Sequence, residues 1–321
     1  MTCRICDAEG HHRRYELREQ MFGAPETFTY FECGSCGCLQ IETIPVDLGR
    51  YYSSDYHSLS FSVERAFQNP IRNVGRRLRC RAAIGQGNAV GRLLLRRYPD
   101  DALASLARLR PTASTRILDV GCGKGYVLCQ LFDAGITNVM GIDPFLEESI
   151  TYPNGPRILK SPLTAVDGEW DIIMFHHSFE HVTNPVETLR ACAERLAHRG
   201  TCVLRLPTIS SYAWRHYQAN WFELDPPRHV TLFSRAGLAL LAERVGLVVD
   251  SVVDDSTASQ FWGSEQCAQN IALMSSQSYL IAPHKSSFSS KQIRNFELRA
   301  RELNARGDGD RVAVYLRKSV A

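Results

Sequence analysis

The 321-residue sequence lacks the features that would place a protein in a membrane or outside the cell. No apolar run approaches the roughly 18 residues that a membrane span requires, and the start, Met1–Cys6, has no apolar signal-peptide core. The net charge of +3 is too small to indicate nucleic-acid binding by itself. With 44% apolar and 22% charged residues, the composition is that of an ordinary globular protein. We therefore expect it in the cytoplasm.

Cysteine, in contrast, is abundant, with 11 residues. Without a secretory signal, this number favours reduced thiols and metal binding over disulfides. Two Cys-x-x-Cys pairs can place four thiolates around one tetrahedral ion. They predict a structural Zn²⁺ site in a zinc-ribbon-like module over residues 1–45, which is too small to fold firmly without a metal. Chance pairing is the alternative, and Cys38 is either a replacement ligand for Cys36 or a packed thiol. The predicted ligands are Cys3, Cys6, Cys33 and Cys36.

Residues 46–112 read as a helical connector that begins with an aromatic cluster, including Tyr56, and then becomes rich in arginine. The simplest interpretation is an amphipathic helix pair with a solvated basic face. A lid that closes over a cofactor and meets an anionic substrate is the sharper hypothesis. Arginines beside Leu93–Leu95 could also make peripheral contact with an anionic membrane surface.

From residue 113 onward, apolar strand patterns alternate with helical ones. This predicts an α/β domain over 113–321: a doubly wound, seven-stranded, mostly parallel sheet of Rossmann-like type, with an insertion of loop and helix over 256–306. Ligands of such sheets bind beyond the carboxyl ends of the strands. The expected strands are 116–120, 138–142, 156–160, 170–175, 201–206, 247–253 and 311–317; the expected helices are 124–134, 146–150, 185–198 and 235–245.

The first strand of this domain runs into a glycine turn, Ile117–Gly125, with Asp119 two residues before the first glycine. Glycines there let a ligand approach the backbone, but the bare pattern is shared by many nucleotide folds. A second acid, Asp143, closes the next strand, where doubly wound units place a ribose-binding carboxylate. Either acid alone could be a helix cap or turn former. Together, they and the L-D-V-G-C-G-x-G spelling resemble motif I of class I S-adenosylmethionine-dependent methyltransferases.

The resemblance implies S-adenosylmethionine as cofactor and S-adenosylhomocysteine as product. Asp119 and the turn amides would face the methionine portion, and Asp143 the two ribose hydroxyls. Residues after the third and fourth strands would complete the pocket, although Ser161 stands where the superfamily often has an Asp. The expected cofactor-binding residues are Asp119, Gly121, Cys122, Gly123, Gly125, Asp143, Pro144, Ser161, Leu163, His176 and His177.

After the fourth strand, Glu180 and His181 begin an E-H-V-x-x-P stretch that resembles small-molecule O-methyltransferases of the ubiquinone-biosynthesis type and sugar methyltransferases. The N/D-P-P-Y/F signature of base-amine methylation is absent here. His177, Glu180 and His181 are spaced i, i+3, i+4, as on one helical face, and could hold Mg²⁺ or another divalent ion. Otherwise Glu180 and His181 form hydrogen bonds within the pocket.

The loop after the fifth strand, 214–234, supplies the expected catalytic base. Related sugar methyltransferases carry it in an H-x-x-x-F-S element, which is matched here by His229, with Ser234 as a helix N-cap. A neutral imidazole can take the proton of a hydroxyl nucleophile. His229 is the first candidate, His181 the competitor, and Glu180 the third member of the catalytic set. Ordinary lid packing is the alternative for the aromatic residues. The expected substrate-binding residues are Tyr56, Tyr217, Trp221 and Arg228.

These features predict methyl transfer to a hydroxyl of a small molecule, an anionic sugar derivative such as a nucleotide sugar or glycan, with nucleic acid an unexpected partner. Sugar C-methyltransferases also join a four-cysteine module to this fold, but their histidine lies in a Tyr-x-Glu-His-like context, unlike Pro227–His229. An RNA methyltransferase that grips phosphates with the zinc module and arginine-rich helices is a second alternative. A non-enzymatic scaffold is the third, and the intact glycine turn disfavours it.

Overall fold

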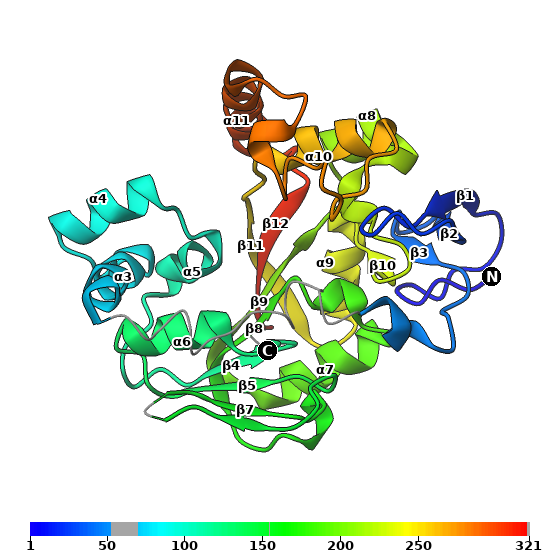
Figure 1. Cartoon of the computed structure of the whole chain (residues 1–321). Coiled ribbons are helices and arrows are strands. Elements are labelled where there is room, and N and C mark those ends of the chain that lie inside the picture. The colour runs from blue at the N-terminus through cyan, green and yellow to red at the C-terminus, as the bar shows by residue number, and fades with distance from the viewer. Residues whose placement is uncertain (53–69, 154, 320–321) are drawn as a thin grey trace. The chain divides into compact units, whose positions relative to one another are not determined.

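The computed structural model describes residues 1–52, 70–153 and 155–319 (Figure 1). Contacts divide the chain into two compact units, and each is described by itself. Unit 1 comprises residues 1–52, 180–189 and 206–314, and unit 2 comprises the rest of the described chain. Among the described residues, no helix combines the length and the apolar character needed to cross a bilayer. The boundaries expected from the sequence at residues 45 and 112 stay a prediction.

The main sheet has eight strands in the order β11-β12-β9-β8-β4-β5-β7-β6. The pairs β4/β5, β4/β8, β5/β7 and β8/β9 are parallel, and β6/β7 is antiparallel. The mostly parallel, Rossmann-like sheet expected from the sequence is therefore confirmed, and all seven expected strands are present. The strands are β4 (Ile117–Val120), β5 (Val139–Ile142), β6 (Ile150–Thr151), β7 (Arg157–Leu159), β8 (Trp170–His176), β9 (Leu196–Pro207), β11 (Leu247–Asp254) and β12 (Arg311–Lys318).

The eighth strand, β6, lies where a helix was expected over 146–150, and that prediction was wrong. A five-residue helix has little stability of its own. Here the segment is held to the next strand instead: the Lys160 amide donates to Ser149 Oγ at 3.0 Å, and the Lys160 ammonium donates to the Glu147 carbonyl at 3.0 Å. Ile150 then pairs with Ile158 of β7.

Unit 2 contains the glycine turn and the helices before it. Asn88 and Asp100 cap two of these helices by accepting from Gly91 N and Leu103 N. Helices α3 and α4 pack closely because Gly91 has no side chain; a Cβ there would lie 2.3 Å from the Leu78 carbonyl oxygen. The helical segments are α3 (Pro70–Ala83), α4 (Ala89–Arg97), α5 (Asp101–Leu106), η2 (Ala107–Leu109), α6 (Tyr126–Asp133) and η3 (Leu163–Ala165).

Unit 1 is built on a four-stranded sheet, in the order β1-β2-β3-β10, that joins the N-terminal segment to the loop carrying His229. Its strands are β1 (Arg13–Arg18), β2 (Thr27–Glu32), β3 (Leu39–Ile41) and β10 (Thr231–Leu232). Buried Tyr30, Leu39, Trp221 and Leu232 form part of one apolar core beneath it. Because β3 pairs with β10, the cysteine-rich segment shares its core with residues about 200 positions later in the chain.

The remaining helical segments agree with the sequence, apart from their ends. The expected helices at 185–198 and 235–245 end earlier, at Arg195 and Glu243, and Ser234 caps the second by accepting from Gly237 N at 2.8 Å. Residues 256–306 contain two helices with loops, as expected. The segments are η1 (Leu48–Tyr51), η4 (Phe179–His181), α7 (Pro185–Arg195), α8 (Tyr212–Tyr217), η5 (Gln218–Asn220), η6 (Phe222–Leu224), α9 (Arg235–Glu243), α10 (Ser259–Ala268), η7 (Pro283–Lys285) and α11 (Ser290–Ala305).

Candidate active site: a cofactor cradle and a histidine cluster

The turn between β4 and α6 requires glycine. Gly121, Gly123 and Gly125 have φ of +73°, +54° and +76°, in the left-handed region that favours glycine. A Cβ on Gly121 would also lie 2.5 Å from Ser178 Cβ, and Ser178 is fixed because its hydroxyl donates to the Val120 carbonyl at 2.6 Å. Positive φ and close packing therefore restrict this turn to glycine, and glycine-rich turns before a helix are typical sites for nucleotide-type ligands.

Two buried carboxylates flank this turn in unit 2, and we call this arrangement the cradle. Asp119 is 2% exposed, and Asp119 Oδ1 has no hydrogen-bond partner among the described residues. Burial, with the neighbouring Asp143 second, raises the pKa of Asp119 to about 8. A buried carboxylate with an unsatisfied oxygen suits a cationic or hydroxylic ligand group.

Asp143 also faces the turn, but both its oxygens already accept backbone hydrogen bonds. Gly123 N donates to Oδ2 and Phe145 N to Oδ1, each at 2.9 Å. Burial raises the pKa of Asp143 in spite of these two bonds, which act in the opposite direction. Each carboxylate oxygen can accept a second bond, so the expected contact with ribose hydroxyls stays open to Asp143 as a prediction. The cradle as a whole fits the ammonium and hydroxyl groups of S-adenosylmethionine.

The other expected cofactor-binding residues lie around the cradle. Cys122 is in the turn, and a side chain on Gly141 of β5 would lie 2.4 Å from Cys122 Sγ. Pro144 follows Asp143 directly, Ser161 donates to the Pro162 carbonyl at 3.2 Å, and Leu163 is buried at the start of η3. Their contacts with the cofactor stay predictions.

His176, the last residue of β8, and His177, the residue after it, differ in their surroundings. Both ring nitrogens of His176 are buried without a hydrogen-bond partner in the described chain, and burial, with Arg205 second, lowers the pKa of His176 to about 3. His177 has a φ of +50°, and Arg205 Nη1 lies 2.9 Å from its Nε2. A guanidinium can only donate, so His177 Nε2 is the acceptor of this bond.

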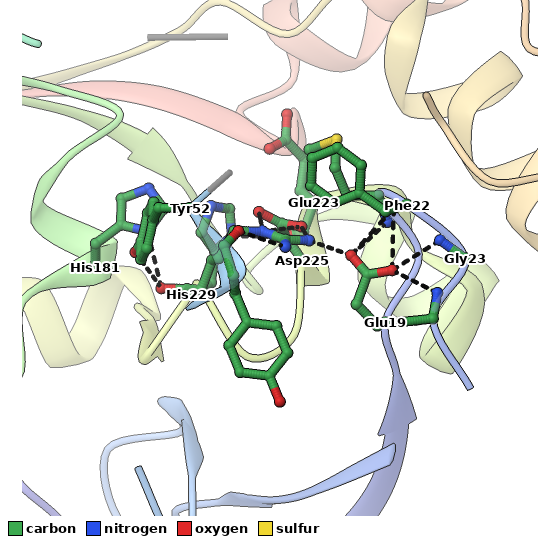
Figure 2. Close-up of polar contacts among 12 residues, drawn as sticks. Glu19, Phe22, Gly23, Tyr52, His181, Glu223, Asp225 and His229 are labelled. Carbon is green, nitrogen blue, oxygen red and sulfur yellow. Dashed lines mark hydrogen bonds and ion pairs between the residues drawn. The ribbon is translucent and has the colours of Figure 1, made fainter. Parts of the chain in front are cut away.

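In unit 1, Glu180, His181 and His229 offer ligand atoms that all lie within 4.8 Å of one another. We call this the histidine cluster, and Figure 2 labels its two histidines, His181 and His229. The two imidazole rings meet edge to face with centroids 4.8 Å apart, and His229 Nε2 lies 3.9 Å from a Glu180 carboxylate oxygen. The arrangement brings together the three residues expected to be catalytic.

Backbone carbonyls fix the tautomer of both imidazoles. His229 Nδ1 lies 2.7 Å from the Glu223 carbonyl oxygen, and His181 Nδ1 lies 2.8 Å from that of Arg228. A carbonyl only accepts, so each Nδ1 carries the proton and each Nε2 keeps a lone pair. Burial, with His229 second, lowers the pKa of His181 to about 3, and burial also lowers the pKa of His229. Both rings are therefore neutral near pH 7.

Two imidazole nitrogens and one carboxylate could hold a divalent ion, but the predicted ligand set was wrong. His229, not His177, completes the group with Glu180 and His181. The expected helical face does not form, because η4 is a three-residue 3₁₀ turn and His177 has left-handed backbone geometry.

The four predicted zinc ligands do come together in unit 1. Cys3, Cys6, Cys33 and Cys36 form a second group whose sulfurs lie within 4.8 Å of one another. The pairs Cys3–Cys36 and Cys6–Cys33 have sulfur–sulfur distances of 3.6 Å, close to the roughly 3.8 Å that tetrahedral Zn–S bonds of about 2.3 Å give. Gln40 Nε2 donates to Cys3 Sγ at 3.0 Å, which is typical of the partners that orient metal ligands. The cluster thus fits a zinc module.

The structure contradicts two of the four expected substrate-binding residues. Arg228 and Trp221 are both 0% exposed: Arg228 forms ion pairs with Asp225 and Glu19, and Trp221 Nε1 donates to Asp310. Tyr217 is partly buried and donates to Glu265, while Tyr56 lies outside the described residues. Cys38 is not in the zinc group and packs 3.7 Å from Ser234 Oγ.

Comparison with known proteins defines the class of the domain. Residues 93–252 match the family model described as "Methyltransferase domain", so this part of the chain is a methyltransferase domain of the S-adenosylmethionine-dependent class that the glycine turn indicated. A tRNA U34 carboxymethyltransferase of Methylococcus capsulatus is 27% identical over 153 residues, which are 40% of this chain and 46% of that relative.

Two further relatives carry the same name. The tRNA U34 carboxymethyltransferase of Pseudomonas fluorescens (strain SBW25) is 32% identical over 100 residues, 28% of this chain and 31% of the relative. That of Geobacter sp. (strain M21) is 42% identical over 57 residues, 18% of each chain. The chain thus spans less than half the length of these curated relatives.

These relatives correct two predictions made from the sequence. The expected acceptor was a sugar hydroxyl and the expected partner an anionic small molecule, with nucleic acid unexpected. Relatives named for tRNA contradict both. The resemblances to sugar and ubiquinone-type enzymes misled because they rest on a few residues around Glu180 and His229, and residues expected to take part in a reaction do not determine what binds beside them.

Proposed function

We propose that the protein transfers a methyl or carboxymethyl group from S-adenosylmethionine or its carboxylated derivative to a nucleoside of a transfer RNA. The observation that supports this most strongly is the partial match of the chain to relatives named tRNA U34 carboxymethyltransferase. An RNA substrate would also place the protein in the cytoplasm.

A basic surface in unit 2 supports an RNA substrate. The sequence has no Asp or Glu between Arg65 and Pro99. Two arginines of α3 serve the fold, since Arg76 pairs with Asp133 at 2.7 Å and Arg79 with Asp100 at 3.0 Å. Others are exposed and have no recorded ion pair in the described chain, and we call them the arginine surface. They are Arg81, Arg92, Arg96 and Arg97.

Arginines of this kind can bind phosphate oxygens of any RNA sequence. The phosphate contacts would position the RNA, while the choice of nucleoside would depend on residues near the acceptor atom. In this proposal the arginine surface contributes to the affinity for tRNA, whereas the cradle and the histidine cluster carry out the transfer reaction.

The cradle would hold the cofactor, which supplies an activated methyl or carboxymethyl group on a sulfonium. Asp119 would bind the amino group of the methionine portion, and the backbone of the glycine turn would accommodate its carboxylate. Asp143 would accept from the ribose hydroxyls through its remaining lone pairs. These contacts fix the donor, so the protein's remaining task is to align the acceptor and remove its proton.

His229 is the proposed base. Its Nδ1 proton is committed to the Glu223 carbonyl, which leaves Nε2 to accept a proton from the acceptor group. Glu180, whose carboxylate lies 3.9 Å from that nitrogen, would stabilise the imidazolium as it forms. His181 remains the competing base, because its Nε2 is equally available.

The test combines transfer and binding. The purified protein is incubated with bulk unmodified tRNA and labelled S-adenosylmethionine, or its carboxylated derivative, and tRNA binding is measured at several salt concentrations. We expect label in the tRNA and an affinity that falls steeply with salt. Absence of transfer by a protein that binds the cofactor would contradict the proposal.

A charge-matched pair of variants tests the arginine surface. Arg96→Glu with Arg97→Glu should weaken tRNA binding at least tenfold and reduce its salt dependence, because each lost phosphate contact removes about one counterion. The control places the same charge change at exposed Arg301 and Arg294 of α11. Equal losses in both pairs would show that net charge alone, and not this surface, determines binding.

A further inference from the structure

Arg228, taken from the sequence as a substrate contact, is buried between two carboxylates. Its Nε lies 2.9 Å from Asp225 Oδ2, and its Nη2 lies 2.5 Å from both Asp225 Oδ1 and Glu19 Oε1. Nη1 donates to the Tyr51 carbonyl at 3.1 Å. Every nitrogen of this guanidinium therefore has a partner from the N-terminal segment or from the loop itself (Figure 2).

Glu19 reaches Arg228 from the turn between β1 and β2. This carboxylate is 3% exposed, and four successive backbone amides donate to it, those of Met21, Phe22, Gly23 and Ala24, at 2.8–3.2 Å. Two buried carboxylates share one guanidinium, and the aligned amides supply the remaining positive potential. The charge of Arg228 and its hydrogen bonds hold the pKa of Asp225 below its ordinary value, although burial acts in the opposite direction.

The backbone of Arg228 and His229 carries the contacts that define the histidine cluster. The Arg228 carbonyl accepts from His181 Nδ1 at 2.8 Å, and the Tyr52 hydroxyl lies 3.0 Å from the same nitrogen. The His229 carbonyl accepts from the Tyr30 hydroxyl of β2 at 2.8 Å. Moving the Arg228 peptide would therefore break the hydrogen bond of His181 Nδ1 and displace the backbone of the adjacent His229.

We propose that Arg228 is a positioning residue, through which Glu19 of the cysteine-rich N-terminal segment fixes the tautomer of His181 and the backbone position of the adjacent His229. The N-terminal segment then has a task beyond holding zinc, since it sets the geometry of the reacting imidazoles. The inference rests on the role proposed above for the histidine cluster but not on the identity of the acceptor.

Two variants test it in the full-length protein. Glu19→Gln keeps the size of the side chain but removes the charge, and Arg228→Lys keeps the charge but cannot contact both carboxylates in a planar fork. We expect kcat to fall about 10- to 100-fold in each, with the KM for the cofactor nearly unchanged. Long-range ¹H–¹⁵N spectra of the imidazoles should show the Nδ1–H form of His181 converting to a tautomeric mixture, and the ring signals of His229 shifting because its backbone moves.

Arg244→Lys is the matched control. Arg244 also joins the N-terminal segment to the rest of unit 1, by pairing with Asp7 at 2.6 Å and donating to the Ile5 carbonyl, but it touches neither histidine. The inference is overturned if Glu19→Gln leaves the imidazole spectra unchanged, or if its kcat equals that of Arg244→Lys. A parallel loss of S-adenosylhomocysteine binding would overturn it as well, because it would report general unfolding. The spectra require no substrate, so a failure of the RNA proposal leaves this test intact.

Discussion

The cradle and the histidine cluster are built in different ways. In the cradle, the turn after β4 meets Asp143 only 20 residues beyond Gly123, and the positive φ values of its glycines set the path of the turn. In the histidine cluster, the Glu223 carbonyl that holds the His229 ring is close in sequence, but the partners that hold the backbone of Arg228 and His229 are distant: the Glu19–Arg228 pair spans 209 positions and Tyr30–His229 spans 199. A short segment of sequence thus determines the cradle, whereas the cluster depends on how the whole of unit 1 folds.

Because the two regions are built differently, substitutions in them should reduce activity in different ways. Damage to a local turn should impair cofactor binding first, whereas damage to long-range support should impair turnover while cofactor binding persists. Catalytic geometry tolerates little displacement, since a shift of about 1 Å can cost roughly 100-fold in rate. The histidine cluster is therefore expected to be the more sensitive of the two regions.

The largest effect is expected from the proposed base itself. His229→Ala should lower kcat by about 10²- to 10⁴-fold, the usual contribution of a general base, and leave the affinity for S-adenosylhomocysteine intact. Single-turnover rates and calorimetry measure the two quantities. His216→Ala is the control, because His216 is an exposed histidine of unit 1 stacked on Tyr212. Near-normal turnover in the His229 variant would exclude His229 and favour His181.

The second-largest effect is expected from loss of the zinc ion that the four cysteines would bind, because the N-terminal segment that they stabilise also supports the histidine cluster. Cys36→Ser should lower the zinc content from about one ion per chain and reduce Tm by about 10 °C, because structural zinc sites contribute directly to folding. Turnover should fall with it, since Glu19 and Tyr30 lie in the same segment. Cys38→Ala is the control: it removes a buried thiol outside the zinc group, so zinc should remain bound. Loss of zinc from the Cys38 variant instead would mean that the ligand set is misassigned.

The sequence was sufficient for the cradle because its signals are local. Strand patterns, the acid before the glycines and the acid that closes β5 all lie within one βαβ unit, and their meaning depends on backbone conformation alone. The two Cys-x-x-Cys pairs were equally readable, since two intervening residues suffice to bring thiolates to one ion. Pairing of β3 with β10 had no comparable signal, because two- and three-residue strands leave little periodicity.

Roles were misread where burial depends on distant partners. Trp221 and Arg228 lie in an aromatic, charged loop whose sequence predicts an exposed position. Both are buried, and their partners are distant in sequence: Trp221 contacts Asp310, 89 positions away, and Arg228 contacts Glu19, 209 positions away. Glu19 itself escaped notice, because a single Glu near a turn is unremarkable until four amides are seen to surround it. The metal set was misassigned by assuming helical phase at His177, where the chain adopts left-handed geometry.

The smallest effect expected is a pH dependence of cofactor binding to the cradle. In the free protein the pKa of Asp119 is raised to about 8, from an ordinary value of 3.8. The folded state then binds more protons than the unfolded state between these values, so this group's contribution to stability is complete below pH 3.8 and is lost as the pH rises through 8. Binding of the cofactor's ammonium group favours the ionised form, so affinity should rise roughly tenfold per pH unit below 8.

Calorimetry in buffers of different ionisation enthalpy measures the proton released on binding at pH 7, where Asp119 is mostly protonated. We expect close to one proton released by the native protein and much less by Asp119→Asn, whose weaker cofactor binding should also be nearly independent of pH. Ser161→Ala is the control, since Ser161 does not titrate in this range and its hydroxyl donates to a neighbouring carbonyl. If the Asp119→Asn variant still released a proton on binding, the titrating group would be Asp143. The ammonium group of the cofactor would then be bound by the carboxylate after β5 and not by the carboxylate of β4, and the signals for the cradle would still lie within one short segment of sequence.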